Sequence, residues 1–148
     1  MSTKASIPVG APQRAQPESL RARTLKAALT VRDLQKSLAW YLDVAGFTIE
    51  QKHEYEGKVR AVSLQAGDVH ILIGQDDGKK GWDRVKGEGF SLQLVTAQDV
   101  DTVANEMKGR GASLESEPAD MPWGPRLFRL RDPDGFILVI SSLPPGES

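Results

Sequence analysis

The stretch LKAALTV at residues 25–31 is followed about 65 residues later by the similar stretch FSLQLVT at residues 90–96. In both, apolar residues alternate with others, which is typical of a strand with two different faces. The similarity continues downstream in the pairs Leu38 and Val103, Leu42 and Met107, Gly46 and Gly111, Ile49 and Leu114, and Glu50 and Glu115. A repeat of this length indicates a supersecondary unit that cannot bury its apolar face alone. Two copies predict a module with a seam between them, where a ligand could bind.

Each copy predicts the order strand, helix, strand, strand, strand. In the first copy, strands are predicted at 25–31, 47–53, 60–66 and 69–74, with a helix that begins after Asp33 and ends at Gly46. The second copy predicts strands at 91–95, 112–117, 127–131 and 136–141, with a helix that ends at Gly111. A four-residue turn, DPDG at 132–135, precedes the last strand.

These patterns divide the chain into two units, 23–75 and 89–143, joined by a connecting loop at 76–88. The loop is rich in glycine and in charges of both signs, so we expect a solvated connection rather than a flap over a pocket. Residues 1–22 are rich in Pro, Ala and Ser and predict a flexible tail or an arm packed on a partner subunit. Residues 144–148 form a short second tail.

Composition excludes several classes of function. The 19 basic and 20 acidic residues are well mixed and give a net charge of -1, so no nucleic-acid partner is expected. No apolar run is long enough for a membrane helix, and the N-terminal stretch lacks the apolar core of a secretion signal, so we expect a cytoplasmic protein without a membrane partner. The absence of cysteine excludes disulfides and thiolate chemistry, and only two histidines, His53 and His70, are present.

Three segments carry a resemblance to a known family: VRDLQKSLAWYLDVAGF at 31–47, DVDTVANEMKGRGA at 99–112 and PWGPRLFRLRDPDGFILVI at 122–140. Together with the repeat they resemble the vicinal-oxygen-chelate superfamily, which includes glyoxalase I, ring-cleaving dioxygenases and bleomycin-resistance proteins. The resemblance covers about residues 25–142. It implies an α+β fold in which two tandem βαβββ units form curved, barrel-like mixed sheets with helices outside, and it implies a homodimer.

Metal-dependent members of this superfamily hold a divalent ion with four side chains, two from each unit, drawn mainly from His, Glu and Gln. The resemblance places these four positions at Lys26, Leu72, Ser91 and Val139. Leucine and valine have no donor atom, a protonated lysine repels a cation, and serine is a poor ligand. We therefore expect no metal and no other cofactor.

Strand alternation predicts which side chains would line the cavity of such a fold. The first strands contribute Lys26, Ala28, Thr30, Ser91 and Gln93, and the last strands contribute His70, Leu72, Ile137 and Val139. The candidate ligand-binding residues are Lys26, Thr30, His70, Leu72, Ser91, Gln93, Trp123, Arg126 and Val139. This mixture of an apolar floor with a few polar groups is typical of sites for organic ligands.

Several of these residues have two interpretations. His70 is either a general base or a structural histidine bonded to a backbone carbonyl. Lys26 either binds an anion or acts as an amine nucleophile, or else it extends from the sheet rim into solvent. Arg126 pairs either with an anionic ligand or with an acid on an edge strand, and Trp123 covers either a pocket or the end of a sheet. His53, flanked by charged residues, is expected at a solvated strand end.

Two main functional hypotheses follow. The first is a metal-free, bleomycin-resistance-like protein that binds a small, largely apolar organic molecule at the seam. In this form Lys26 would replace the cation and face a ligand carboxylate or enolate, with His70 and Ser91 as hydrogen-bond partners. The alternative is a lyase, isomerase or dioxygenase of the same superfamily that is metal-dependent or uses Lys26 and His70. A purely structural or regulatory dimer is a third possibility.

Overall fold

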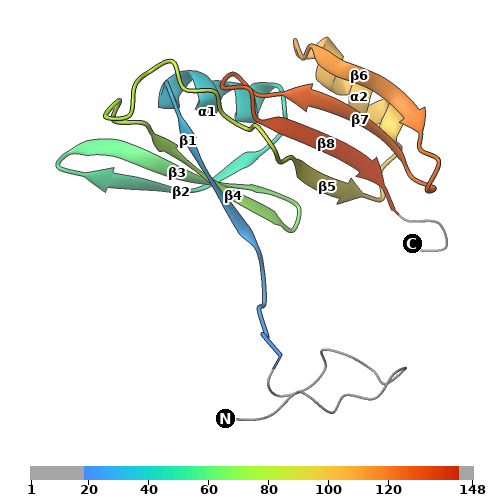
Figure 1. Cartoon of the computed structure of the whole chain (residues 1–148), viewed down its shortest axis with the longest axis horizontal. Helices are drawn as coiled ribbons and strands as arrows, with labels where there is room; N and C mark the ends of the chain where they lie inside the picture. The colour runs from blue at the N-terminus through green and yellow to red at the C-terminus, as the bar shows by residue number, and fades with distance from the viewer. Residues whose placement is uncertain (1–18, 144–148) are drawn as a thin grey trace.

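The computed structural model describes residues 19–143, in which eight strands and two helices follow the order expected from the sequence (Figure 1). The first unit contains β1 (Lys26–Val31), α1 (Leu34–Asp43), β2 (Thr48–Tyr55), β3 (Lys58–Ala66) and β4 (Val69–Gln75). The second contains β5 (Leu92–Thr96), α2 (Val100–Gly109), β6 (Leu114–Asp120), β7 (Arg126–Arg131) and β8 (Ile137–Ser142). Most of the predicted tail 1–22 and all of the predicted tail 144–148 lie outside the described residues.

The two units form two four-stranded mixed sheets with equivalent strand orders. The first sheet has the order β1-β4-β3-β2 and the second has the order β5-β8-β7-β6. In each, the first strand of the unit pairs in parallel with the last strand, and the other neighbours are antiparallel. This is the βαβββ topology, so the prediction of two tandem units is confirmed. The sheets are curved but do not close into a barrel (Figure 1).

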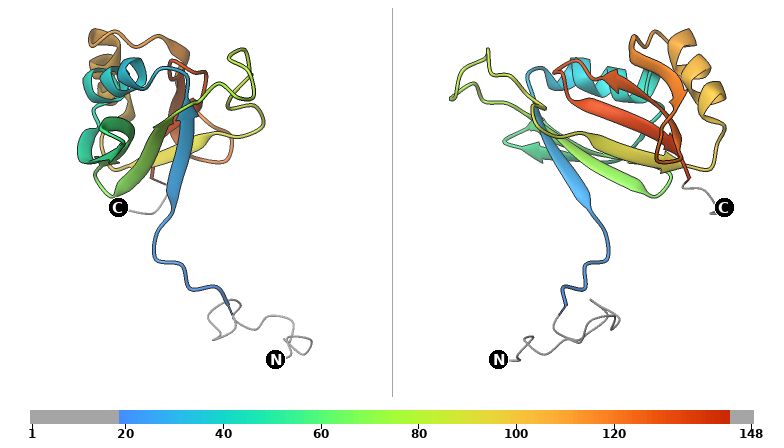
Figure 2. Two further views of the ribbon diagram at one scale, coloured as in Figure 1. Left: turned by 90° about the vertical axis from the view of Figure 1, so that its left-hand side faces the viewer. Right: turned by 45° about the vertical axis from the view of Figure 1, so that its right-hand side comes forward.

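Helix α1 begins directly after Asp33, as the sequence predicts, and α2 begins after Asp99, for which no cap was predicted. An aspartate side chain caps each one: Asp33 accepts a hydrogen bond from the backbone N–H of Lys36 at 3.2 Å, and Asp99 accepts one from that of Thr102 at 3.0 Å. Such caps satisfy N–H groups that the first turn of a helix leaves without partners. Both helices lie on the same side of the sheets (Figure 2).

One hydrophobic core lies between the helices and the sheets and extends through both units. Leu29 and Val31 of β1 belong to it, together with Tyr41 of α1 and Phe128 of β7. The alternate residues of β1 therefore point away from the helices. We call this opposite side of the first sheet its open face; its residues include Lys26, Ala28, Thr30, Ser63 and Leu72.

A buried hydrogen bond joins the two units. The Tyr41 hydroxyl of α1 donates to the Asp132 carboxylate of the DPDG turn at 2.7 Å. Asp132 also accepts from the backbone N–H groups of Asp134 and Phe136, both at 2.9 Å. Burial raises the pKa of Asp132, although these hydrogen bonds oppose the increase. The turn therefore fixes the second unit to the first.

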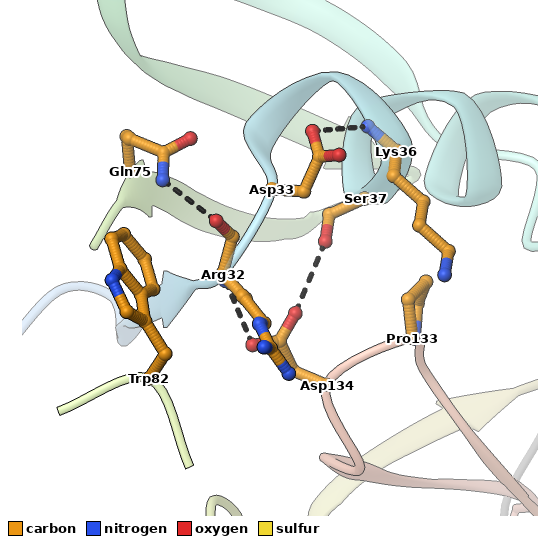
Figure 3. Close-up of a pocket in the computed structure, with 8 residues that line it drawn as sticks. All are labelled: Arg32, Asp33, Lys36, Ser37, Gln75, Trp82, Pro133 and Asp134. Carbon is orange, nitrogen blue, oxygen red and sulfur yellow. Dashed lines mark hydrogen bonds between the residues drawn. The ribbon is translucent and has the colours of Figure 1, made fainter. Parts of the chain in front are cut away.

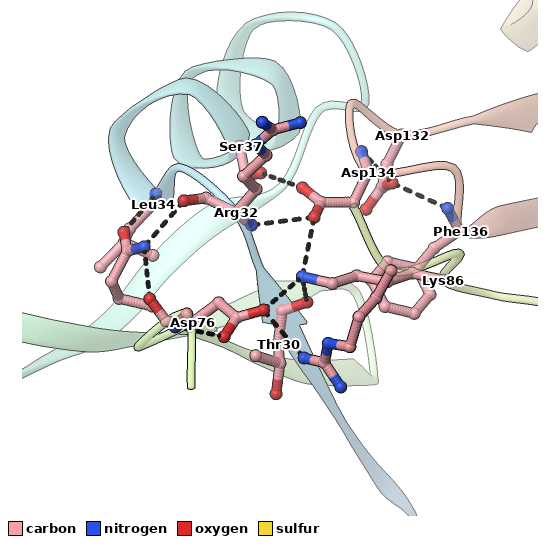
Figure 4. Close-up of polar contacts among 12 residues, drawn as sticks. Thr30, Arg32, Leu34, Ser37, Asp76, Lys86, Asp132, Asp134 and Phe136 are labelled. Carbon is pink, nitrogen blue, oxygen red and sulfur yellow. Dashed lines mark hydrogen bonds and ion pairs between the residues drawn. The ribbon is translucent and has the colours of Figure 1, made fainter. Parts of the chain in front are cut away.

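The connecting loop is bound more firmly than the sequence predicts. The Lys86 side chain is only 10% exposed, and its ammonium contacts the carboxylates of Asp76 and Asp134, both at 3.1 Å (Figure 4). It also donates to the backbone carbonyl of Thr30 at 2.9 Å. The expectation of a wholly solvated connection is wrong, because Lys86 joins the ends of both units.

Two residues that the repeat placed on the core face are exposed instead. Leu25 is 83% exposed and Phe90 is 49% exposed. Leu25 directly precedes β1, and Phe90 lies two residues before β5. In both copies the core face therefore begins two residues later, at Ala27 and at Leu92. Within residues 19–143, no helix is long and apolar enough to cross a membrane.

Candidate functional site

The four positions that correspond to the family's metal ligands are placed equivalently in the two units. Leu72 on β4 pairs with Ala28, two residues after Lys26, and Val139 on β8 pairs with Gln93, two residues after Ser91. Ser91 lies just before β5 rather than within it. The two aliphatic side chains have no donor atom and Lys26 is a cation, so this set does not suit a divalent metal. Among residues 19–143, no group of three or more His, Asp or Glu side chains is arranged to hold one.

Lys26 lies across the open face of the first sheet. Its ammonium reaches past β4 and donates to the hydroxyl of Ser63 on β3 at 3.1 Å. Ser63 is only 3% exposed. Lys26 as a whole is exposed, so its ammonium is held at Ser63 while the rest of the side chain stays open to solvent.

His53 contacts the same serine. Its Nε2 lies 2.8 Å from Ser63 Oγ, and the residue is half-buried. The expectation of a solvated strand end is therefore wrong. The register of β2 shifts on both sides of this segment, between Ile49 and Gln51 and between His53 and Glu54. Such bulges change the face to which a side chain points, which is how His53 reaches the open face.

His70 is held by a carboxylate. Its Nδ1 lies 3.0 Å from Glu50 Oε1, and both side chains are about one-third exposed. The sequence suggested a backbone carbonyl as the structural partner, so that detail is wrong. A carboxylate partner fixes the orientation of the imidazole ring. Its role in binding or proton transfer remains a prediction.

A pocket of about 320 Å3 lies at the seam between the units. Three of the predicted residues line it together: His70, Ser91 and Gln93. The rest of its lining is mainly apolar and comes from both units: Leu25, Ala27, Phe47, Val69, Ile71, Leu92, Leu94 and Leu138. These side chains lie on the strand face that the sequence assigned to the core. Their part in a pocket depends on how the two sheets are placed, and no local pattern encodes that.

The other predicted residues do not line the seam pocket. Thr30 is exposed, Leu72 is half-buried, and Val139 is only 1% exposed. Arg126 forms ion pairs with Asp101 at 3.1 Å and Asp120 at 3.2 Å, as in its structural interpretation, and the bond with Asp101 is the largest cause of its raised pKa.

Trp123 is also outside the seam pocket. It lies in the turn between β6 and β7 and is 68% exposed. It lines neither the seam pocket nor the hollow beside the start of α1.

A larger and more polar hollow, of about 620 Å3, lies beside the start of α1 (Figure 3). Arg32, Lys36, Trp82 and Pro133 are among its walls. Most of its other polar groups are engaged with each other, because Asp134 accepts hydrogen bonds from the Arg32 backbone and the Ser37 hydroxyl. Sequence patterns gave no indication of this hollow, since it joins the first unit, the connecting loop and the DPDG turn. Its hydrogen bonds stabilise the junction of the units.

Comparison with known proteins agrees with this architecture. The model of the Glyoxalase/Bleomycin resistance protein/Dioxygenase superfamily matches residues 23–140. A probable lactoylglutathione lyase from Synechocystis sp. is 24% identical over 122 residues, which cover 78% of this chain and 92% of that protein. A probable lactoylglutathione lyase from Vibrio cholerae is 26% identical over 124 residues, which cover 80% of this chain and 88% of that protein.

A solved structure has the same fold. It is a member of the glyoxalase/bleomycin resistance protein/dioxygenase superfamily from Sphaerobacter thermophilus, with a TM-score of 0.69 and 24% sequence identity. The similarity covers 83% of this chain and 98% of that one.

Proposed function

This chain belongs to the Glyoxalase/Bleomycin resistance protein/Dioxygenase superfamily, and from that premise we propose that it binds a small organic molecule at the seam without a metal ion. The observation that carries the proposal is the seam pocket of about 320 Å3, to which both units contribute. Its size lies at the lower end of the range for small-molecule sites. Apolar walls with His70, Ser91 and Gln93 at hand suit an aromatic or largely apolar ligand with one or two polar atoms.

The absence of metal-ligating side chains at Lys26, Leu72, Ser91 and Val139 supports the metal-free part of the proposal. Binding strength would come from removing apolar ligand surface from water, worth roughly 25 cal/mol per Å2. The orientation of the ligand in the pocket would be set by the few polar groups. This resembles sequestration by bleomycin-resistance proteins more than chelation by a metal enzyme.

The experiment uses two adjacent alanines on opposite faces of β1. Ala27 lines the seam pocket, whereas Ala28 is exposed on the open face. A panel of neutral aromatic compounds of the size of indole is titrated into labelled protein and followed by NMR. We expect shifts at Leu92 and Leu94, and we expect Ala27→Leu to weaken binding by about tenfold because its larger side chain occupies the pocket. Ala28→Leu should leave the affinity unchanged.

The result would be negative if no compound of the panel shifts the seam residues. It would also be negative if Ala28→Leu weakened binding as much as Ala27→Leu, because the ligand would then lie on the open face. Urea unfolding of both variants checks that the larger side chain at Ala27 leaves the protein folded.

A second candidate function is an enzyme of the same superfamily: a lyase, an isomerase or a dioxygenase. It is favoured by the relatives described as probable lactoylglutathione lyases. In this chain such an enzyme would use Lys26 and His70 for proton transfer, since the metal positions lack suitable donors. The assay is the formation of lactoylglutathione, with and without added divalent metal; activity lost in both Lys26→Met and His70→Gln would favour the enzyme.

A further inference from the structure

Three polar side chains from three strands converge on the open face of the first sheet. Lys26 comes from β1, Ser63 from β3 and His53 from β2. The Lys26 ammonium lies 3.1 Å and the His53 Nε2 lies 2.8 Å from the same oxygen, Ser63 Oγ. We call these residues the open-face trio. None of them lines the seam pocket described above.

The chemistry of the three groups fixes which atoms donate and which accept in the hydrogen bonds of the trio. An ammonium can only donate, so Ser63 Oγ accepts from Lys26. The hydroxyl proton of Ser63 is then best used by donation to His53 Nε2, because Ser63 is buried and an unused buried donor is costly. In this arrangement neutral His53 carries its proton on Nδ1.

The trio has a positive charge that no acid neutralises. Within residues 19–143, no carboxylate lies within 4.0 Å of the Lys26 ammonium. Glu50, which approaches this part of the sheet, is bonded to His70. An ammonium has three N–H donors, of which Ser63 takes one. The other donors are available to an anion.

Beside this charge lies an apolar surface. Leu72 pairs with both Ala28 and Ser63, so it lies between the strands that carry Lys26 and the serine, and it is half-buried. A single cation next to an aliphatic side chain suits an organic acid with one carboxylate better than a small, highly charged anion.

We propose that Lys26, Ser63 and His53 form a binding site for the carboxylate of a small organic acid on the open face of the first sheet. This goes beyond the proposed function, because the site is separate from the seam pocket and lies on the opposite face of β1. Lys26 holds the carboxylate, and Ser63 and His53 fix the ammonium in place. The trio replaces His70 and Ser91, which the sequence suggested as the polar partners of Lys26.

The test compares benzoate with benzamide, which differ mainly in the charge of one group. Each is titrated into the full chain and followed by NMR of the His53 ring and the Lys26 side chain. We expect benzoate to shift both residues, and we expect Lys26→Met to weaken benzoate binding by about 10- to 150-fold, the usual effect of a charged hydrogen bond. Lys58→Met, which removes an exposed lysine from the same sheet, is the matched control and should change nothing.

Two further measurements exclude a merely structural role for the trio. Ser63→Ala should weaken benzoate binding while leaving the protein folded, because the change removes one oxygen without adding bulk. In the unliganded protein, nitrogen NMR should find neutral His53 with its proton on Nδ1. A proton on Nε2 would contradict the direction of the hydrogen bonds and the site built on them.

The outcomes separate this inference from the proposed function. If benzoate shifts only the seam residues Leu92 and Leu94, and Lys26→Met binds it as tightly as the unmodified chain, the carboxylate site is refuted and seam binding stands. Equal effects of Lys26→Met and Lys58→Met on benzoate binding would also refute it. If neither benzoate nor the neutral aromatic panel shifts any residue, both proposals fail.

Discussion

At the scale of single residues, the hydrogen bond between Tyr41 and Asp132 is a buried contact that joins the two units. The Tyr41 side chain is fully buried, and burial together with the Asp132 carboxylate raises the pKa of its hydroxyl. The carboxylate lies in the second unit and the hydroxyl in the first. Loss of either partner leaves a buried polar atom without its hydrogen bond.

We therefore predict that Tyr41→Phe lowers the free energy of unfolding by about 1.5–3 kcal/mol, the usual value for a hydrogen bond to a charged group. Urea unfolding measures it. The control is Tyr55→Phe, because Tyr55 is 66% exposed, and it should change stability by less than about 0.5 kcal/mol. Equal effects of the two changes on the free energy of unfolding would show that the hydrogen bond between Tyr41 and Asp132 does not stabilise the fold.

The lowered pKa of Asp76 predicts how the stability of the protein depends on pH. Its hydrogen bonds with Arg84, the backbone N–H of Gly78 and Lys86 hold the pKa of its carboxyl well below the ordinary value of 3.8. A carboxyl with a lowered pKa in the folded state stabilises the protein above its ordinary pKa, and this contribution is lost as the pH falls below that value.

The measurement is the melting temperature of the unmodified chain and of Asp76→Asn between pH 7 and pH 2. The unmodified chain should be the more stable at neutral pH, and the difference should shrink below about pH 3.8. Asp83→Asn, at an exposed residue of the same loop, should show no such difference. A difference between Asp76→Asn and the unmodified chain that stayed constant at all pH values would contradict the assignment.

At the scale of elements, most of the fold could be predicted from the sequence. Helix α1 begins after its predicted cap, Asp33, and β3 and β7 end at the predicted residues, Ala66 and Arg131. Local information was sufficient because caps, turns and strand alternation are local properties. The candidate site was harder: the bulges of β2 that turn His53 towards Ser63 leave no clear mark in the sequence, and the apolar lining of the seam pocket depends on how two distant units pack.

The connecting loop gives a prediction at the same scale. Lys86→Met preserves most of the aliphatic stem of the side chain but removes the charge that joins Asp76 to Asp134. Hydrogen exchange followed by mass spectrometry should then show opening of the loop at 76–88 and of the DPDG turn at 132–135, with exchange faster by about tenfold or more. Lys80→Met changes an exposed lysine of the same loop and should leave exchange as it was. If exchange in the DPDG turn did not change in Lys86→Met, the loop would not connect the units in the way described.

At the scale of the whole molecule, we predict a homodimer. Each sheet has two edge strands, and its helices cover only one side, so hydrogen-bonding groups and sheet faces remain available to a second copy. Exposed apolar side chains at Leu25, Val95 and Trp123 add to the surface that a partner would cover. Sedimentation at micromolar concentration should give twice the 16.1 kDa of one chain. A monomer under these conditions would refute the prediction.

The central proposal is that this protein works without a metal ion, and elemental analysis of the purified protein tests it most directly. The chain is exposed to zinc, nickel, manganese and iron, dialysed and analysed. Because Lys26, Leu72, Ser91 and Val139 stand where the family resemblance places the metal ligands, we predict far less than one equivalent of any of these metals. One equivalent that survives dialysis and is lost on substitution of a seam residue such as Ser91 would contradict the claim.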